Sequence, residues 1–134
     1  MVRVYLAGNV YATEYRSQVK RDYSHKIEAV DPITENGAIV NTTDKTIKHI
    51  KTFDEIVEND KALIDTCKIL VAYVDKYTAG TMMELIYAFN RNIPVYVIVP
   101  QGQNFANDIW IQYHTTKFFF NIDDCFNHIL KQIK

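Results

Sequence analysis

One carboxylate interrupts an apolar stretch that is typical of the start of a helix. Glu84 stands between Met83 and Leu85 in the segment GTMMELIYAF. Thr81 precedes it by three positions, and T-x-x-E is the pattern of a capping box, which the local sequence favours. The alternative is a nucleophile or general base that faces a ligand. We expect a carboxylate so close to a helix N-terminus to stay ionised, because exposed amides stabilise its charge.

Three further residues could complete a site around this acid. Gly80 permits close approach of the backbone just before the helix. Tyr5 lies in the first expected strand, from which its hydroxyl can reach a neighbouring loop. Asp60 lies on the helix before the third strand and, taken alone, is interpreted as a solvated helix charge. Carboxylates in such a setting would carry nucleophilic or acid–base chemistry.

Motifs for metals and cofactors are missing from the sequence. The histidines show no H-x-x-x-H or H-x-E grouping, and Cys67 and Cys125 lie outside any C-x-x-C. Neither a G-x-G-x-x-G nor a Walker sequence occurs, so neither a dinucleotide nor a P-loop site is indicated. We therefore expect no metal and no cofactor.

The composition is typical of one globular domain, 1–134, with 48% hydrophobic and 23% charged residues. Fifteen basic and sixteen acidic residues give a net charge of -1, so no basic excess is available to bind a nucleic-acid backbone. No apolar run approaches the ~20 residues that span a bilayer, and the start of the sequence is unlike a signal peptide. We expect a cytoplasmic protein that binds small molecules, not nucleic acid or membrane.

Strand-like and helical segments alternate along the chain. Strands are expected at 2–8, 26–32, 68–75, 94–100 and 117–120. Helices are expected at 12–24, 53–67 and 122–134, and around the i, i+3, i+4, i+7 stripe of Met82, Leu85, Ile86 and Phe89. The polar segment 33–52, with an Asn-Gly turn, is expected to be a loop. The alternation predicts a single-domain, doubly wound α/β fold of flavodoxin- or Rossmann-like type, with about five parallel strands.

In such sheets ligands bind beyond the carboxyl ends of the strands. Those ends are Gly8 with Asn9, Asp31, 75–81 and 101–108. Glu84 follows the third of these ends closely, which places it near the expected crevice.

The order of several motifs resembles a known enzyme family. VYLAGN is followed by EYR and DP, and then by END…IDTCKILVAYVD…AGTMMELIYAFNRNIPV. The most specific piece is G-T-x-x-E-x-x-x-A with its following P-V strand, and NDIWIQYHTTKFFFNIDD adds a C-terminal match. Over 2–119 the chain is similar to the nucleoside 2-deoxyribosyltransferases and the related nucleotide N-glycosidases.

The resemblance implies transfer of 2-deoxyribose between nucleobases through a covalent intermediate. Glu84 would attack the anomeric carbon and expel the base, and a second base or water would then release the sugar. Tyr5 matches the tyrosine that orients the nucleophile, and Asp60 matches an aspartate placed near the substrate. The other residues implied to line the substrate here are Gly8, Asn9, Gly80 and Thr81.

One position departs from many deoxyribosyltransferases, which carry an aspartate six positions before the catalytic glutamate. Here that position is Thr78, and the related nucleotide hydrolases carry a hydroxyl residue there that contacts the 5′-phosphate. Thr78, helped by Arg16, could therefore bind a nucleotide, although Arg16 alone is interpreted as a helix-surface charge. Asp75 in the same loop could supply the missing acid. Base exchange on nucleosides and hydrolysis of nucleoside 5′-monophosphates both stay open.

Two residues near the C-terminal segment bear on assembly. In the family, residues from this region reach into a neighbouring subunit's site, which implies such a role for Asn107 and Trp110 and a homo-oligomer, a dimer or larger. Trp110 could equally belong to the core or to a subunit interface. A third interpretation is a non-catalytic flavodoxin-like module that binds nucleotides or a partner protein, with Glu84 acting only as a cap.

Overall fold

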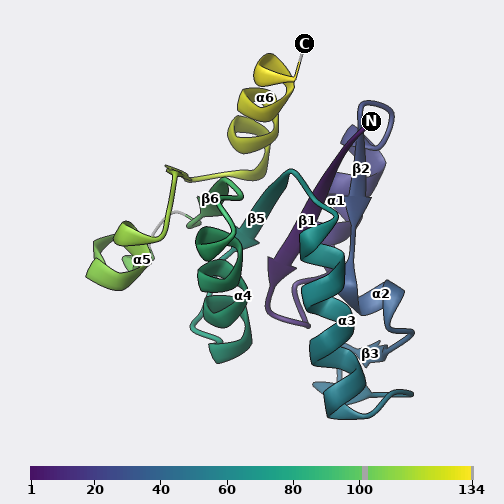
Figure 1. The fold of residues 1–134 in the computed structure, drawn as a ribbon. Helices are drawn as coiled ribbons and strands as arrows, with labels where there is room; N and C mark the ends of the chain where they lie inside the picture. Colours follow the sequence, from purple (N-terminus) through teal and green to yellow (C-terminus); the bar gives the residue numbers. More distant parts are fainter. Residues whose placement is uncertain (101–102, 134) are drawn as a thin grey trace.

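A five-stranded parallel sheet forms the centre of the protein in the computed structural model, which describes residues 1–100 and 103–133 (Figure 1). The strand order is β2-β1-β5-β6-β7, and every neighbouring pair is parallel. The expected fold class is confirmed. Of the strand-end segment expected at 101–108, residues 101–102 lie outside the described residues. The strands are β1 (Val2–Gly8), β2 (Ile27–Val30), β5 (Ile69–Tyr73), β6 (Val95–Ile98) and β7 (Lys117–Phe119).

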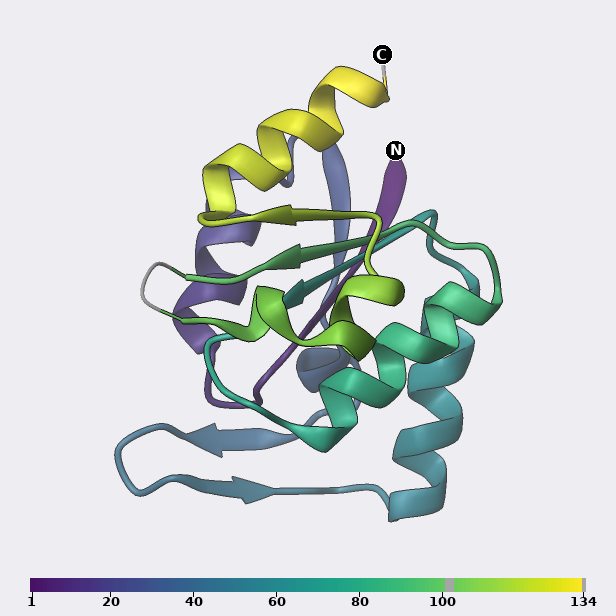
Figure 2. The same ribbon diagram turned by 90° about the vertical axis from the view of Figure 1, so that its left-hand side faces the viewer.

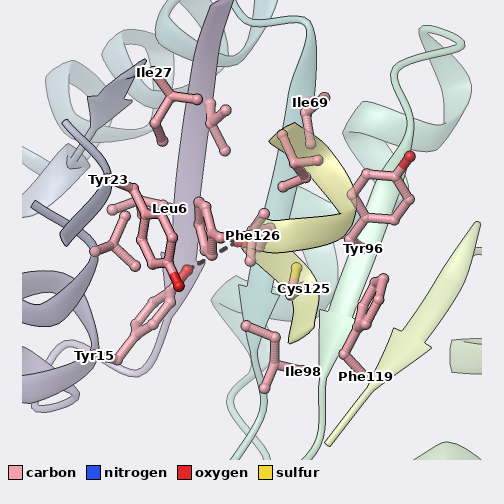
Figure 3. Close-up of a cluster of buried hydrophobic side chains, with 14 residues drawn as sticks. Leu6, Tyr15, Tyr23, Ile27, Ile69, Tyr96, Ile98, Phe119, Cys125 and Phe126 are labelled. Carbon is pink, nitrogen blue, oxygen red and sulfur yellow. Dashed lines mark hydrogen bonds between the residues drawn. The ribbon is translucent and has the colours of Figure 1, made fainter. Parts of the chain in front are cut away.

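Helices cover both faces of this sheet. On one face Tyr15 of α1 and Phe126 of α6 pack against strand residues such as Leu6 (Figure 3). On the other face Ile64 of α3 and Leu85 of α4 close a second core cluster. No helix in the described part of the chain is both long and apolar enough to cross a membrane. The helices are α1 (Thr13–Tyr23), α2 (Pro32–Glu35), α3 (Phe53–Asp65), α4 (Ala79–Asn90), α5 (Ile109–Tyr113), α6 (Ile122–Gln132) and the 3₁₀ helix η1 (Phe105–Asn107).

Strand β1 divides its side chains between the two faces. Val4 and Leu6 enter the core beneath α1 and α6, whereas Tyr5 and Ala7 enter the core beneath α3 and α4. This is the two-residue period of a strand that is covered on both faces. The phenol of Tyr5 is thereby delivered to the side of the sheet on which α4 lies.

The segment 33–52 is not the single loop that its polar composition predicts. It contains most of α2 and an antiparallel hairpin of β3 (Ile39–Asn41) and β4 (Thr46–Lys48), seen at the bottom of Figure 2. The Asn-Gly pair ends α2 instead of turning the hairpin, and its glycine, Gly37, adopts a φ of +71°. Strands of three residues are too short to show an alternating pattern, which is why the prediction was wrong here.

The strand order opens a crevice at the carboxyl ends of β1 and β5. From β1 the chain moves to β2 on one side and then returns to β5 on the other side of β1. The loops that follow β1 and β5 lead to α1 and α4, which lie on opposite faces of the sheet. Doubly wound sheets bind ligands at such a reversal of strand order.

Candidate active site

A cavity of about 410 Å³ lies at this crevice, bounded by the end of β1, α2, the β3–β4 hairpin, α3 and α4. Apolar side chains such as Ile47 of the hairpin and Ile56 of α3 form much of its wall, as is usual for a small-molecule site. The predicted site residues that line it are Gly8, Asn9, Arg16, Asp60, Thr78, Gly80, Thr81 and Glu84.

Glu84 lines the cavity from the second turn of α4, and the capping box predicted for it does not form. The helix begins at Ala79 with Thr78 as its N-cap, so Thr81 already lies inside the helix. The hydroxyl of Tyr5, a fully buried residue, donates a hydrogen bond to Oε2 of Glu84. The acid therefore pairs with a core tyrosine instead of with the backbone at the helix start.

Burial raises the pKa of the Glu84 carboxyl from its ordinary value of 4.5 to about 7. The hydrogen bond from Tyr5 and the charge of Arg16 oppose this rise, whereas the charge of Asp60 adds to it. The expectation that Glu84 stays fully ionised near pH 7 is wrong, because in the second turn the helix amides already bond to carbonyls of the preceding turn.

Asp60 is not the solvated charge that its isolated place on α3 suggests. It lines the cavity, and its Oδ1 accepts a 2.8 Å hydrogen bond from Nδ2 of Asn36. Burial raises the pKa of Asp60, although that bond and the charge of Lys51 act in the opposite direction. Two carboxyls with raised pKa, those of Glu84 and Asp60, thus share one cavity. Within residues 1–100 and 103–133, no group of three His, Cys, Asp or Glu residues could hold a metal ion.

Arg16 is buried, with 4% of its surface exposed, and is not a helix-surface charge. Its guanidinium donates hydrogen bonds of 2.8 and 3.0 Å to the carbonyls of Asn9 and Gly8, and its Nε lies 3.4 Å from Oδ1 of Asp31. These contacts hold the loop between β1 and α1 in place. The N–H groups that bond to these carbonyls are therefore not free for a substrate phosphate, and Nε is buried without a hydrogen-bond partner in the described part of the chain.

The β1–α1 loop presents an amide to the cavity. Gly8 has a φ of +153°, and a Cβ there would lie 3.1 Å from the carbonyl oxygen of Tyr73, so this position suits only glycine. Asn9 is 7% exposed, and its Oδ1 accepts a 3.1 Å bond from the N–H of Tyr11. Nδ2 of Asn9 has no acceptor among the described residues, which leaves it available to a ligand.

The N-terminus of α4 opens on the same cavity. Thr78, Gly80 and Thr81 line it, and no described side chain caps the helix. The Thr78 hydroxyl donates instead to the Thr81 hydroxyl at 2.7 Å. The first amides of the helix are therefore free to bind an anionic group.

Four predicted site residues do not line this cavity: Tyr5, whose hydroxyl bonds to Glu84 from the core, and Asp75, Asn107 and Trp110. Asp75 does not line it, and Oδ1 of Asp75 is buried without a hydrogen-bond partner in the described part of the chain. Asn107 and Trp110 lie on η1 and beside it on α5, and Trp110 is 68% exposed. Trp110 borders a smaller hollow of about 250 Å³ together with Tyr77 and Met82.

Several residues of the cavity were missed by sequence reasoning. Asn36, 5% exposed, and His49 belong to the segment 33–52 that was expected to be a loop. Met83 and Tyr87 lie near Glu84 on α4 and also line the cavity. They were missed because they do not belong to the apolar stripe from which the helix was predicted. The Asn-Gly pair was the one available signal, because it marks a place where the chain turns sharply.

Comparison with solved structures shows the same fold at low sequence identity. A conserved protein from Enterococcus faecalis V583 is 19% identical, with a TM-score of 0.72 over 99% of this chain and 99% of that chain. A 2-deoxyribosyltransferase from Bacillus psychrosaccharolyticus is 22% identical, with a TM-score of 0.71 over 94% of this chain and 91% of that chain. A CMP N-glycosidase from Clostridium botulinum is 15% identical, with a TM-score of 0.61 over 96% and 98%.

The solved structures show the fold, whereas the match to a family model shows the family. None of the curated proteins matches the sequence significantly. The model of the family described as "Nucleoside 2-deoxyribosyltransferase like", however, matches residues 1–103, which include β1, α3 and α4 with Glu84. Because this match spans well over half of the chain, the protein belongs to the nucleoside 2-deoxyribosyltransferase-like family.

Proposed function

We propose that this protein transfers 2-deoxyribose between nucleobases, with Glu84 as the nucleophile. A carboxylate oxygen of Glu84 bonds to C1′ of a bound deoxynucleoside while the C1′–N bond breaks, and its electron pair leaves with the base. The sugar is then held as an ester. A nitrogen of a second base attacks C1′, the ester C1′–O bond breaks, and Glu84 regains its carboxylate. Water in place of the second base gives hydrolysis.

One observation carries this proposal: Glu84 lines a largely apolar cavity and does not cap its helix. Tyr5 bonds to Oε2, and no residue in the described ranges donates a hydrogen bond to Oε1. An acid that served only as a cap would bond to backbone amides of the first turn. The unpartnered oxygen is the one that can reach C1′.

Asp60 is the proton donor to the leaving base in this proposal. The aspartate that many deoxyribosyltransferases carry is Thr78 here, and Asp75 does not line the cavity. Asp60 does line it, and burial raises its pKa, which favours the protonated form that a general acid needs. The same carboxylate takes a proton back when the acceptor base attacks.

Hydrolysis of a nucleoside 5′-monophosphate is the second candidate, and the open N-terminus of α4 favours it. The Thr81 hydroxyl, which accepts from Thr78 and keeps its own proton, and the free amides at Gly80 can donate to a phosphate. Gly80 and Glu84 are four residues apart, or about 6 Å along the helix. That spacing would let one nucleotide place its phosphate at the helix start and C1′ beside Glu84.

The protein is also proposed to act as a homo-oligomer with shared sites. Helix α5 exposes a cluster of large apolar side chains: Ile109 is 75%, Trp110 68% and Tyr113 72% exposed. A cluster of this size on a surface favours a protein partner. A second copy of the chain bound at α5 would bury these three apolar side chains, which are otherwise exposed to solvent.

The test incubates the protein with deoxynucleosides and with their 5′-monophosphates, each with and without free adenine. Base exchange predicts new deoxyadenosine when adenine is present, and a deoxyribosyl adduct on Glu84 by mass spectrometry. Glu84→Ala should remove both products. Glu14→Ala, which changes an exposed glutamate on α1, is the matched control and should retain them.

The products separate the three interpretations. Hydrolysis of a monophosphate predicts free base and deoxyribose 5-phosphate without an acceptor, and Thr78→Ala should raise the KM of that reaction. Full activity in Glu84→Ala would refute the assigned nucleophile. A wild-type protein that binds nucleotides but converts none of these substrates would instead be the non-catalytic module.

A further inference from the structure

Asn36 is a buried amide whose polar atoms are all engaged. Its Nδ2 donates bonds of 2.8 Å both to Oδ1 of Asp60 and to the carbonyl oxygen of Pro32. Its Oδ1 accepts a 2.9 Å bond from Nδ2 of Asn59. A carboxylate oxygen and a carbonyl oxygen both accept, so the NH₂ end of Asn36 must face them and the orientation of the amide follows from chemistry.

We propose that Asn36 is a positioning residue that determines which oxygen of Asp60 carries a proton. This inference rests on the proposed function, in which Asp60 protonates the leaving base. An oxygen that accepts an N–H bond cannot present its own proton in that direction. Since Oδ1 accepts from Asn36, the proton of the neutral acid resides on Oδ2. No hydrogen bond to Oδ2 comes from the residues that the structure describes, so Oδ2 is left for the cavity that Asp60 lines.

Asn36 also restricts the rotation of the Asp60 side chain. Asn59 and Asp60 are successive residues of α3, and Asn36 bridges them from the end of α2. Rotation of the Asp60 carboxyl would break its hydrogen bond to Nδ2 of Asn36. Asn36 cannot follow that rotation, because the same nitrogen also bonds to the carbonyl oxygen of Pro32. A proton donor must hold its position relative to the leaving nitrogen, because small displacements at the reacting atoms cost large factors in rate.

The charged groups around Asp60 come from several elements. Lys51, just before α3, acts on the charge of Asp60, and Asp60 in turn acts on Glu84 of α4 and Tyr5 of β1. Arg16, His49 and Lys61 line the same cavity. Asn36 is neutral, so it orients Asp60 without adding a charge. Burial raises the pKa of Asp60, and the bond from Asn36 opposes that rise. Loss of the bond should therefore raise this pKa further.

The test compares wild type with Asn36→Leu, which keeps the approximate shape of the side chain and removes its donors. ¹³C NMR titration measures the pKa of the Asp60 carboxyl, whose signal is identified by its absence in Asp60→Asn. We expect a higher pKa in Asn36→Leu. We also expect kcat for base exchange to fall about tenfold or more with KM little changed, because the proton donor is no longer held in position toward the leaving nitrogen.

A second variant covers the case in which Asn36→Leu does not fold. Asn59→Leu removes the donor that holds Asn36 and changes a half-buried helix residue; it should shift the same pKa and kcat in the same direction by less. Asn127→Leu, at an exposed position on α6, is the matched control and should change neither.

The outcomes separate this inference from the function on which it rests. An unchanged Asp60 pKa in folded Asn36→Leu and Asn59→Leu overturns the inference, even if kcat falls, because a purely structural defect would lower kcat without moving that pKa. If wild type catalyses neither reaction but the pKa still rises in Asn36→Leu, the orientation of Asp60 by Asn36 stands and the proposed function fails.

Discussion

Replacement of Glu84 by glutamine should stabilise the folded protein. Burial raises the pKa of this carboxyl from 4.5, the value expected in the unfolded chain, to about 7. Between these two pH values the folded state holds a proton that the unfolded state has released, so the free energy of unfolding falls as the pH rises. At about 1.4 kcal/mol for each pH unit, wild type loses at most about 3 kcal/mol by pH 7 and above.

Glutamine removes this cost and keeps the local contact. It has nearly the shape of glutamate, and its side-chain oxygen can still accept the hydrogen bond from Tyr5. We expect Glu84→Gln to match wild type below pH 4.5 and to exceed it by up to about 3 kcal/mol above pH 7. A capping glutamate predicts the opposite sign, a loss of about 1 kcal/mol.

Urea unfolding at one pH below 4.5 and one above 7 measures the difference. The free energies come from linear extrapolation of a single cooperative transition. Glu14→Gln, at an exposed position, should show no gap that depends on pH. The reasoning is refuted if Glu84→Gln is less stable than wild type at both pH values, or if its advantage does not widen between them.

Three further variants probe the same cavity and its neighbouring surface. Tyr5→Phe removes the bond that lowers the pKa of Glu84, so the acidic limb of the pH profile of kcat/KM for base exchange should move to higher pH; a limb that stays in place contradicts the contact. Asp60→Asn removes the charge that raises this pKa, so the same limb should move to lower pH while kcat falls about a hundredfold or more through loss of the acid. This decrease in kcat should be small for a base that leaves without protonation. A synthetic substrate with such a leaving group tests this. Trp110→Glu places a charge in the exposed cluster on α5 and should lower the mass seen by sedimentation velocity; an unchanged oligomer would show that this surface is not the interface.

The sheet could be predicted from the sequence because its strands are continuous apolar runs. The segment 68–75 is a nearly continuous apolar run between Lys68 and Asp75, and 94–100 is bounded by proline at each end. Runs of this kind, alternating with helical stripes, leave few topologies for a parallel sheet. The crevice followed from the same reasoning, since its position depends on strand order and not on side-chain detail.

The capping assignment failed because two T-x-x-E patterns occur and local sequence does not distinguish them. Thr52 and Glu55 do form a capping box at the start of α3. At α4 the helix begins earlier, at Ala79, which places Thr81 and Glu84 inside it. The residue at which each helix begins depends on the position of the preceding strand in the fold, and the local sequence does not contain that information.

The burial of Arg16 could not be predicted for a related reason. Its partners are backbone carbonyls of Gly8 and Asn9, which carry no signal in residue type. Asn36 likewise acquires its partner Asp60 only when α2 folds against α3. Polar residues that become buried through non-local contacts look like surface residues in the sequence.

Glu84 and Asp60 are the same kind of group, so the different roles proposed for them must come from their neighbours. Tyr5 and Arg16 both favour a charged Glu84, whereas Asp60 receives its hydrogen bond from the neutral amide of Asn36. Negative charge on Asp60 raises the pKa of Glu84, and by reciprocity an ionised Glu84 disfavours ionisation of Asp60. The pair therefore favours a single shared proton, and in the free protein Glu84 holds it, because burial raises the pKa of Glu84 to about 7 while Asn36 and Lys51 favour a charged Asp60.

The first step of the proposed reaction needs an ionised nucleophile and a protonated acid, so the shared proton must pass from Glu84 to Asp60 before the C1′–N bond breaks. Loss of Tyr5 raises the pKa of Glu84 further, so the nucleophile gives up its proton less readily. Loss of Asp60 leaves Glu84 more readily ionised but the leaving base unprotonated. The two substitutions should therefore differ in their dependence on leaving group, although both carboxyls serve one bond cleavage.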